Sequence, residues 1–264
     1  MDIEILIIGN EILQGHTNDT NSYWLAKRIT KYGHKLNRIL TIGDNLEQIQ
    51  SSLQYLLEKN PDIIITCGGL GPTFDDMTLK GVAEALNRNL VKNQKAYEMI
   101  EKAYKQAYER GILKLDGMTK EREKMAYLPE DGKPLPNKRG TAPGVELKEG
   151  DTIIYCLQGV PAEMKGIFNH MIKPKLKKES EEFIEKGFSF QGIGESQIAP
   201  FVTELEEQHP ELWIKTHPKV GLAVEVEITV TAFNVEDGEN LVNDVIQKLK
   251  QTVRDLGGKI KKSK

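Results

Sequence analysis

Apolar runs and amphipathic segments alternate along the first half of the chain. Each apolar run ends in a glycine or polar turn, as the run 3–8 does at Gly9. Between these runs apolar residues recur every three or four positions, which is the spacing of a helix with one buried face. In chain order the pattern predicts strand 3–8, helix 20–32, strand 36–42, helix 46–57, strand 62–66 and helix 78–86. This alternation predicts an α/β fold, with a mostly parallel sheet covered by helices on both faces.

The middle of the chain continues this pattern less regularly. Residues 94–110 have the spacing of an amphipathic packing helix. Residues 129–150 are rich in Pro and Gly and predict turns, whereas residues 152–157 predict a strand that leads into another helix.

The charged stretch 173–186 predicts a boundary between a first domain, residues 1–172, and a second, residues 173–264. Beyond the boundary the pattern predicts strand 188–193, helix 195–207, strand 221–233 and helix 237–256. Residues in the second of these strands alternate strictly between apolar and polar, as in a sheet with one face in solvent. The second domain is therefore expected to be a small α+β unit.

The composition is that of a soluble globular protein. Of the 264 residues, 39% are hydrophobic and 28% charged, and no apolar run reaches the about 18 residues of a membrane helix. The chain opens directly into a strand pattern without a signal-peptide pattern, so we expect a cytoplasmic protein. Cys67 and Cys156 each end an apolar run and are expected to be buried thiols. The net charge of −3 gives no indication of a nucleic-acid partner.

The segment 66–78 carries the most chemical information. The glycines Gly68, Gly69 and Gly71 follow an apolar strand and precede a helix, an arrangement in which backbone N–H groups approach phosphate. The same turn holds Asp75 and Asp76, which would repel phosphate unless a cation lay between them. The segment therefore predicts a metal-bridged nucleotide or pterin phosphate.

Two further loops follow strands and are expected at the same edge of the sheet. Asp44 follows the second strand; alone it is more often a helix cap than a catalyst, and its value rests on its expected place beside Asp76. The loop 9–21 is unusually polar, and Thr20 or Asn21 is expected to cap the next helix. Ligands bind at the carboxyl ends of parallel strands, so these loops are expected to converge on one site.

A cationic turn lies in the Pro- and Gly-rich stretch. Lys138 and Arg139 are the expected charge partners for a diphosphate, although cationic surface turns are common. With this turn, the expected ligand contacts are Asn10, Glu11, Thr20, Asn21, Gly68, Gly69, Gly71, Pro72, Thr73, Lys138, Arg139, Gly140, Thr141 and Gly144.

The order of these motifs resembles the CinA family, the competence/damage-inducible proteins whose fold is that of the molybdopterin-binding MoaB and MogA proteins. The resemblance rests on motifs that begin at Gly9, Asp19, Gly43, Gly68, Pro136 and Gly159, with Gly192–Ser196 beyond them. Two positions depart from the family pattern, since Asn10 stands where Asp is frequent and Met125 where Gln is usual.

The resemblance implies a function as well as a fold. In molybdopterin-adenylylating relatives two aspartates act at the pterin–nucleotide site, and these correspond to Asp44 and Asp76. In CinA proteins the first domain is associated with metal-dependent hydrolysis of ADP-ribose, and FAD has been proposed as a substrate. The second domain is implied to be KH-like. Bacterial members add a deamidase domain, and the sequence ends before it, so deamidase activity is not expected.

The leading hypothesis from the sequence is hydrolysis of ADP-ribose or a related dinucleotide. Asp44, Asp75 and Asp76 would be catalytic, and Asp44 and Asp76 would bind Mg²⁺, Mn²⁺ or Co²⁺. One alternative is adenylylation of molybdopterin, and another is a non-catalytic nucleotide- or pterin-binding module. The expected partners are a small nucleotide or pterin phosphate and further copies of the chain, without membrane or nucleic acid.

Overall fold

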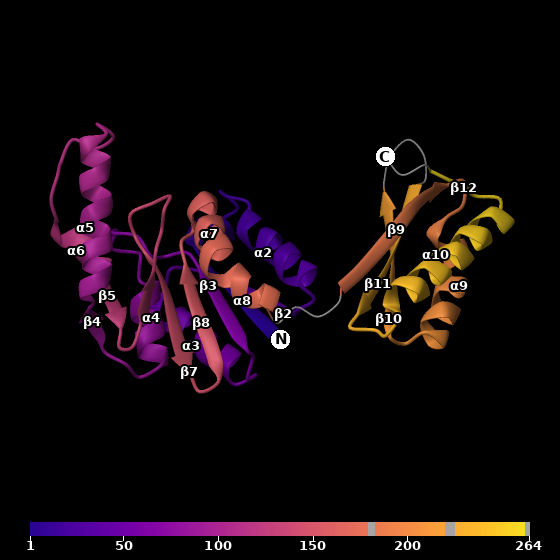
Figure 1. Cartoon of the computed structure of the whole chain (residues 1–264), viewed down its shortest axis with the longest axis horizontal. Helices are drawn as coiled ribbons and strands as arrows, with labels where there is room; N and C mark the ends of the chain where they lie inside the picture. The colour runs from indigo at the N-terminus through magenta and orange to yellow at the C-terminus, as the bar shows by residue number, and fades with distance from the viewer. Residues whose placement is uncertain (179–182, 220–224, 262–264) are drawn as a thin grey trace. The chain divides into compact units, whose positions relative to one another are not determined.

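The chain folds into two compact units in the computed structural model, which describes residues 1–178, 183–219 and 225–261 (Figure 1). One unit is made almost entirely of residues 1–179 and the other of residues 180–264. The break lies within the charged stretch 173–186. Helix α8 (Lys173–Lys178), which a boundary at residue 172 assigns to the second domain, belongs to the first unit.

The first unit is built on a six-stranded sheet with the order β2-β1-β3-β8-β7-β6. Its strands are β1 (Asp2–Ile8), β2 (Lys35–Ile42), β3 (Ile63–Cys67), β6 (Lys133–Leu135), β7 (Gly144–Glu149) and β8 (Thr152–Leu157). The strands β2, β1, β3 and β8 run parallel, and β7 and β6 continue the sheet antiparallel. The expected mostly parallel sheet is confirmed.

Helices cover both faces of this sheet. They are α2 (Thr20–Lys31), α3 (Leu46–Leu57), α4 (Thr78–Ala85), α5 (Gln94–Glu109), α7 (Pro161–Ile167), the π-helix η1 (Phe168–Ile172) and α8. The helices α3, α4 and α5 pack into one core with Leu6, Ile8 and Ile64 of the sheet. Neighbouring strand residues point to the opposite face, where Figure 1 shows α2, α7 and α8 grouped away from α3 and α4.

Several short elements were not predicted. In the first unit these are α1 (Asn10–Leu13), α6 (Lys120–Lys124), the two-stranded pair of β4 (Leu90–Lys92) and β5 (Tyr127–Pro129), and the strands β6 and β7, where the sequence predicted only turns. A three-residue strand is too short to show alternation. Pro134 in β6 also argues against a strand on sequence grounds, although an edge strand tolerates it.

The second unit is a small α+β fold, as expected. Its elements are β9 (Phe183–Gln191), α9 (Glu195–Gln208), β10 (Leu212–Lys219), β11 (Glu225–Phe233), α10 (Gly238–Asp255) and β12 (Lys259–Ile260), and the antiparallel strand order is β10-β11-β9-β12. This is the βαββαβ arrangement of ferredoxin-like domains. The expected strand 221–233 is seen from Glu225 onward; residues 221–224 lie outside the described residues.

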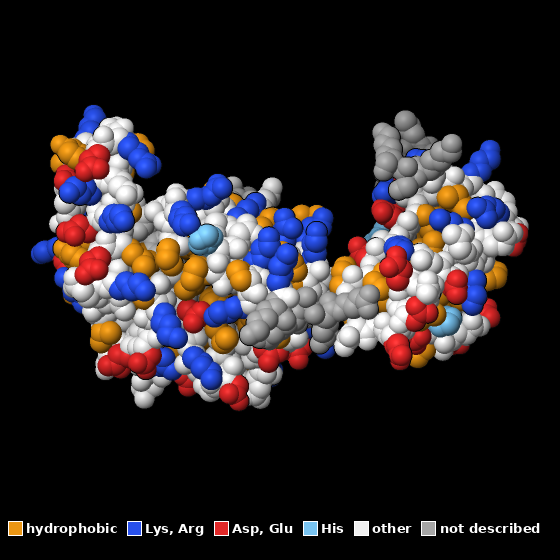
Figure 2. All heavy atoms as spheres, viewed as in Figure 1, with side chains coloured by type: hydrophobic (Ala, Val, Ile, Leu, Met, Phe, Trp, Pro, Cys, Tyr) orange, Lys and Arg blue, Asp and Glu red, His pale blue; other side chains and the backbone are white. Residues whose placement is uncertain are grey.

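The surface and the thiols agree with the composition. Both units carry acidic and basic side chains on the face shown in Figure 2. Within the described residues, no helix has the length and hydropathy needed to cross a bilayer. Cys67 and Cys156 are free and buried, and burial raises their pKa values to about 12 and about 11, as befits inert core thiols.

Candidate functional site

A cleft of about 410 Å³ opens at the carboxyl edge of the first sheet. The loops after β1, β2, β3 and β8 all contribute to its wall. Chain order reverses between β1 and β3, and open α/β sheets bind ligands at such a switch point. The lining residues are Ile8, Gly9, Glu11, Asp44, Gly68, Gly69, Leu70, Gly71, Pro72, Thr73, Asp75, Asp76, Met125, Thr141, Ala142, Gln158, Gly159, Val160 and Glu163.

The glycine turn lies at the centre of this wall. Gly68 and Gly69 have φ values of 116° and 65°, so side chains there would be strained, and a Cβ on Gly68 would meet the carbonyl oxygen of Ile8. Thr78 holds the turn in place, since its hydroxyl donates to Gly68 O at 2.8 Å and its N–H to Gly69 O at 3.1 Å.

The turn presents unused backbone donors to the cleft. Among the described residues, the N–H groups of Gly69, Leu70 and Gly71 have no acceptor. Thr73 differs from the expectation, because its N–H already donates to Asp76 Oδ2 at 2.9 Å. The expected phosphate-binding amides are thus restricted to Gly69–Gly71, and Pro72 has no N–H to contribute.

Asp76 is not a helix cap. The cap position of α4 is Met77, which makes no side-chain capping bond, and the Asp76 carboxylate instead folds back onto Thr73. The bonds to Asp76 fall on Oδ2, so Oδ1 is available to the cleft. Its conformation therefore fits a ligand-binding role better than a helix-capping role.

Asp44 is not a cap either. Asn45 caps α3 by accepting from the N–H of Gln48, whereas Asp44 Oδ2 accepts the N–H of Asn10 at 2.8 Å. The side chain of Asn10 accepts the N–H of Asp44 in return, at 3.3 Å. These two bonds join the loops after β1 and β2. They give Asn10, which is not among the lining residues, a supporting position beside Asp44.

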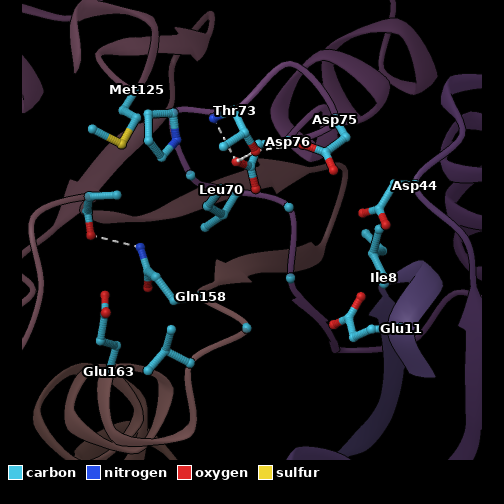
Figure 3. Close-up of a pocket in the computed structure, with 18 of the residues that line it drawn as sticks. Ile8, Glu11, Asp44, Leu70, Thr73, Asp75, Asp76, Met125, Gln158 and Glu163 are labelled. Atoms are coloured by element: carbon cyan, nitrogen blue, oxygen red, sulfur yellow. Dashed lines mark hydrogen bonds between the residues drawn. The ribbon is translucent and has the colours of Figure 1, made fainter. Parts of the chain in front are cut away.

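Asp75 completes the acidic wall. Figure 3 shows Asp44, Asp75 and Asp76 along one side of the cleft, with Glu11 below Asp44. The hydrogen bond from the Thr73 hydroxyl is the main reason that the pKa of Asp75 lies below its usual range, and the nearby Lys124 ammonium lowers it further. Lys124 on α6 also donates to Thr73 O. Sequence reasoning missed this lysine, because α6 was not predicted.

The opposite wall comes from the loop after β8 and the start of α7. Gln158 and Glu163 lie there in Figure 3, across the cleft from the aspartates. Gln158 is only 5% exposed, and its Oε1 atom is buried without a hydrogen-bond partner in the described structure. The motif that begins at Gly159 pointed to this loop only as a family signature, and neither side chain was among the expected contacts.

Several expected contacts lie outside the cleft lining. Asn21 is 9% exposed and lies behind the lining residue Gly159, to whose carbonyl oxygen its Nδ2 donates at 2.7 Å. Asp19 caps α2, in place of the expected Thr20 or Asn21, by accepting from two N–H groups. The expected contacts that the cleft does not include are Asn10, Thr20, Asn21, Lys138, Arg139, Gly140 and Gly144.

The basic turn is directed away from the site. Lys138 Nζ lies 2.9 Å from His170 Nε2, and Arg139 lies beside Gly166 of α7. Gly140 stands behind Glu163, where a Cβ would meet its carboxylate, and Gly144 opens β7 against Cys156 O. Thr141 is the one residue of the expected set in this turn that lines the cleft.

The acidic wall suits a hard cation that is also coordinated by the phosphate of a molecule bound in the cleft. Among residues 1–178, 183–219 and 225–261, no three Asp, Glu, His or Cys side chains are close enough to hold a metal unaided. Mg²⁺ commonly uses one or two carboxylates together with water and substrate phosphates. Asp44 and Asp76 next to free backbone donors provide this kind of partial ligand set.

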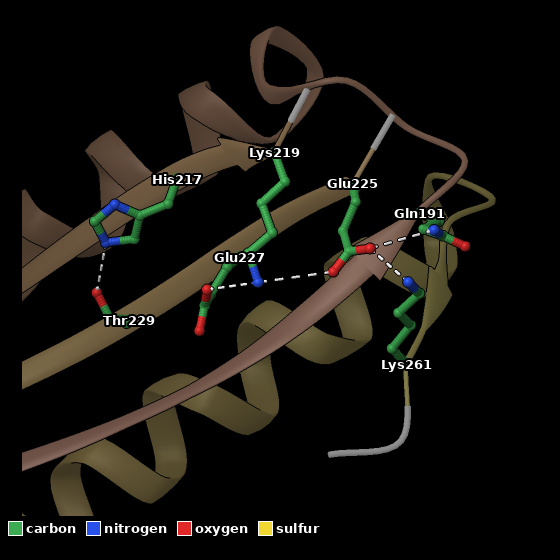
Figure 4. Close-up of polar contacts among 7 residues, drawn as sticks. All are labelled: Gln191, His217, Lys219, Glu225, Glu227, Thr229 and Lys261. Atoms are coloured by element: carbon green, nitrogen blue, oxygen red, sulfur yellow. Dashed lines mark hydrogen bonds and ion pairs between the residues drawn. The ribbon is translucent and has the colours of Figure 1, made fainter. Parts of the chain in front are cut away.

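The second unit has a hollow of about 580 Å³ on the exposed face of its sheet. Four of its charged groups are already paired with one another, since Glu225 contacts Lys261 at 2.5 Å and Lys219 contacts Glu227 at 2.9 Å (Figure 4). The bond from Lys261 is the main cause of the low pKa of Glu225, and the bond to Glu227 raises the pKa of Lys219. The first cleft is therefore the better candidate, because the N–H groups of Gly69–Gly71 and the Oε1 atom of Gln158 have no partner among the described residues.

The chain is similar in sequence to other proteins and in structure to a solved protein. A protein of Sulfolobus acidocaldarius is 38% identical over 262 residues, 97% of this chain and 96% of its own length. A protein of Thermococcus kodakarensis is 37% identical over 232 residues, 86% of this chain and 91% of its own. The crystal structure of the protein CinA from Thermoplasma acidophilum, described as having unknown function, is 34% identical with a TM-score of 0.59; the match covers 66% of this chain and 98% of that one.

The family described as "Probable molybdopterin binding domain" matches residues 4–178, which include every residue of the cleft. With the similarity to CinA, this match confirms the resemblance drawn from the motifs and the α/β fold class. The chain belongs to the family of probable molybdopterin-binding domains.

Proposed function

We propose that the cleft binds a phosphorylated pterin of the molybdopterin class and promotes adenylylation of its phosphate. The main support is one juxtaposition: the free N–H groups of Gly69, Leu70 and Gly71 line the same cleft as Asp44 and Asp76. Backbone donors without side chains suit phosphate oxygens, and carboxylates suit a cation that bridges to them. The family match favours this reading over hydrolysis of ADP-ribose or FAD, for which the comparisons offer no support.

The residues of the chain have distinct roles in this reaction. Gly69–Gly71 would donate hydrogen bonds to the pterin phosphate, while Asp44 and Asp76 would hold a divalent cation such as Mg²⁺. When bound, the cation supplies positive charge to the phosphate oxygens. Asn10 keeps Asp44 oriented, and Thr73 keeps Asp76 oriented.

Adenylyl transfer joins two phosphates directly. An oxygen of the pterin phosphate attacks the α-phosphorus of ATP, the bond from that phosphorus to the β-phosphate oxygen breaks, and pyrophosphate leaves. Charge builds on the oxygens around the α-phosphorus, and preorganised donors next to them lower the barrier. Hydrolysis of a dinucleotide would use the same groups, with water as the attacking species.

The deciding experiment offers the purified protein molybdopterin with ATP and, separately, ADP-ribose and FAD, each with Mg²⁺, Mn²⁺ or Co²⁺. We expect pyrophosphate release that depends on molybdopterin. Consumption of ADP-ribose or FAD alone would instead identify a hydrolase, and tight pterin binding without turnover under any metal would identify a binding module.

We expect Asp76→Asn to lower turnover by about 100-fold or more, since it removes a charge next to the reacting phosphate. Asp244→Asn, a matched change at an exposed position on α10, should leave turnover unaltered. Full activity in Asp76→Asn would show that the acidic wall is not the catalytic site. Circular dichroism of both variants checks that they are folded.

A further inference from the structure

On the wall opposite the aspartates, the side chains of Gln158 and Glu163 offer hydrogen-bond acceptors to the cleft. Both N–H groups of the Gln158 amide are used, since Nε2 donates to Ala142 O at 2.7 Å and to Pro143 O at 2.8 Å. A flipped amide would place Oε1 against these two carbonyl oxygens, so the orientation is fixed by its surroundings. The Oε1 atom of Gln158 is consequently the free end of the amide, buried and without a partner among the described residues.

Glu163 presents a second acceptor on the same wall. Asn137 fixes it by donating to Glu163 Oε2 at 2.6 Å, and the other Nδ2 proton of Asn137 goes to Ala142 O at 2.9 Å. In Figure 3 the carboxylate of Glu163 points toward Gln158. Thr141, the neighbouring hydroxyl, donates to Tyr104 Oη at 3.4 Å. The donors of these side chains are therefore engaged with the protein itself.

Two acceptors that face the same space without a donor are an unfavourable arrangement. A buried amide oxygen loses its hydrogen bond to water, and a neighbouring carboxylate adds repulsion. A ligand that brings two adjacent N–H donors satisfies both groups at once. The two acceptors therefore favour a ligand with two neighbouring N–H donors on one edge.

We infer that the Gln158–Glu163 wall binds a heterocycle through a 2-amino-4-oxopyrimidine edge, and that it discriminates against adenine. In this edge a ring N–H and an exocyclic amino group lie side by side, and pterins and guanine share it. Adenine offers an amino donor beside a ring nitrogen that accepts hydrogen bonds. That ring nitrogen would face one of the two acceptors of the wall, Gln158 or Glu163, without a proton between them. The inference rests on the proposed function and names the part of the ligand that lies farthest from the reacting phosphate.

The test is a binding series on the full chain. Neopterin monophosphate, which is fluorescent, is titrated into the protein with Mg²⁺ and then displaced by GMP, IMP or AMP. We expect GMP to displace it, with IMP about 10-fold weaker because it lacks the amino group, and AMP weaker still, because buried acceptors are left unpaired. Tighter binding of neopterin monophosphate than of GMP identifies a pterin site, and the reverse order identifies a guanine nucleotide site.

Two variants connect the preference with this wall. Glu163→Gln and Gln158→Leu should each reduce the preference for GMP over AMP toward unity, whereas Glu101→Gln, an exposed carboxylate on α5, should retain it. If AMP displaces the pterin as well as GMP does, if none of these probes binds, or if both variants keep the preference, the inference is wrong. Should Gln158→Leu fail to fold, Glu163→Gln and the native series still decide.

The result of the binding series can be distinguished from the result of the turnover assay that tests the proposed function. The base preference is measured at equilibrium without ATP, so it persists even if no adenylyl transfer occurs. Conversely, turnover can be lost in Asp76→Asn while GMP and AMP bind equally well. That result would support the proposed reaction and contradict base recognition by the Gln158–Glu163 wall.

Discussion

In the acidic turn, the Thr73 hydroxyl oxygen lies 2.5 Å from Asp75 Oδ1 and 2.5 Å from Asp76 Oδ2. A hydroxyl group has one proton, so it donates to one carboxylate at a time. The N–H of Thr73 keeps Asp76 in place independently, at 2.9 Å. The hydroxyl is thus free to stabilise the charged form of Asp75, and this bond is the main cause of the lowered pKa of Asp75.

We therefore expect Thr73→Val to raise the pKa of Asp75 toward its ordinary value. The hydroxyl favours the ionised carboxylate, so its removal lets Asp75 take up a proton at higher pH. The measurement is the pH titration of the Asp75 carboxyl carbon by NMR. Thr73→Ser, which keeps the hydroxyl, should titrate as the native protein does, and an unchanged Asp75 titration in Thr73→Val would contradict the assignment.

At the scale of single residues, the sequence identified the acidic wall but not the opposite one. Asp44 and Asp76 could be placed together because each follows a parallel strand, and such strand ends share one edge. The role of Gln158 depends on two carbonyl groups that only the folded chain brings to its amide. Lys138 and Arg139 suited phosphate by charge, but the direction of a long side chain depends on its neighbours, here His170 and Gly166.

At the scale of elements, the pairing of β1 with β2 includes a buried charge. Glu4 is 1% exposed and lies opposite Arg38, whose Nη1 is 3.5 Å from Glu4 Oε1. Burial is the main reason that the pKa of Glu4 is raised, and Arg38 opposes this effect. The folded chain therefore binds this proton more tightly than the unfolded chain, and ionisation of Glu4 opposes folding as the pH rises above 4.5.

We expect Arg38→Leu to lower the free energy of unfolding by about 1–3 kcal/mol at pH 7, because it leaves a buried carboxylate without a partner. The loss should be smaller near pH 4.5, where Glu4 is partly protonated. Urea unfolding at the two pH values measures the difference. Lys35→Leu removes a charge from an exposed position of the same strand and should show no such pH dependence. Equal losses at both pH values for Arg38→Leu would contradict the role of Glu4.

Most of the long elements could be predicted, although the eight-residue strand β10 was not, whereas the shortest elements could not. The helix α3 follows the predicted range 46–57 because Ile49, Leu53 and Leu56 repeat over several turns and Asn45 caps it. The strands β4 and β6 have three residues each, too few to show a periodic pattern, and β4 also pairs with a strand more than 30 residues away in the sequence. The acidic wall of the cleft could be predicted for this reason, because its residues follow strands that the sequence pattern identifies.

At the scale of the whole molecule, each of the two units has a hydrophobic core of its own. The core in the first unit includes Leu6, Ile49 and Ile64, whereas the core in the second includes Phe190, Ile228 and Val245. The described members of the two cores do not overlap. The cleft residues all belong to the first unit, so its polar network depends directly on the first core. The chain is thus expected to unfold in two steps, as proteins with more than one domain commonly do.

The two tryptophans allow this expectation to be tested, because Trp24 lies on α2 in the first unit and Trp213 on β10 in the second. We expect Ile228→Ala to destabilise the second unit by about 2–5 kcal/mol, since it leaves a cavity in a fully buried position, and to leave the first unit unchanged. In a Trp24→Phe background Trp213 fluorescence should report an earlier urea transition, while in a Trp213→Phe background Trp24 should report the native midpoint. Ile64→Ala, equally buried in β3, should give the opposite result. If either alanine substitution shifts both transitions together, the two cores unfold as one cooperative unit, and pterin binding would then depend on the second core as much as on the first.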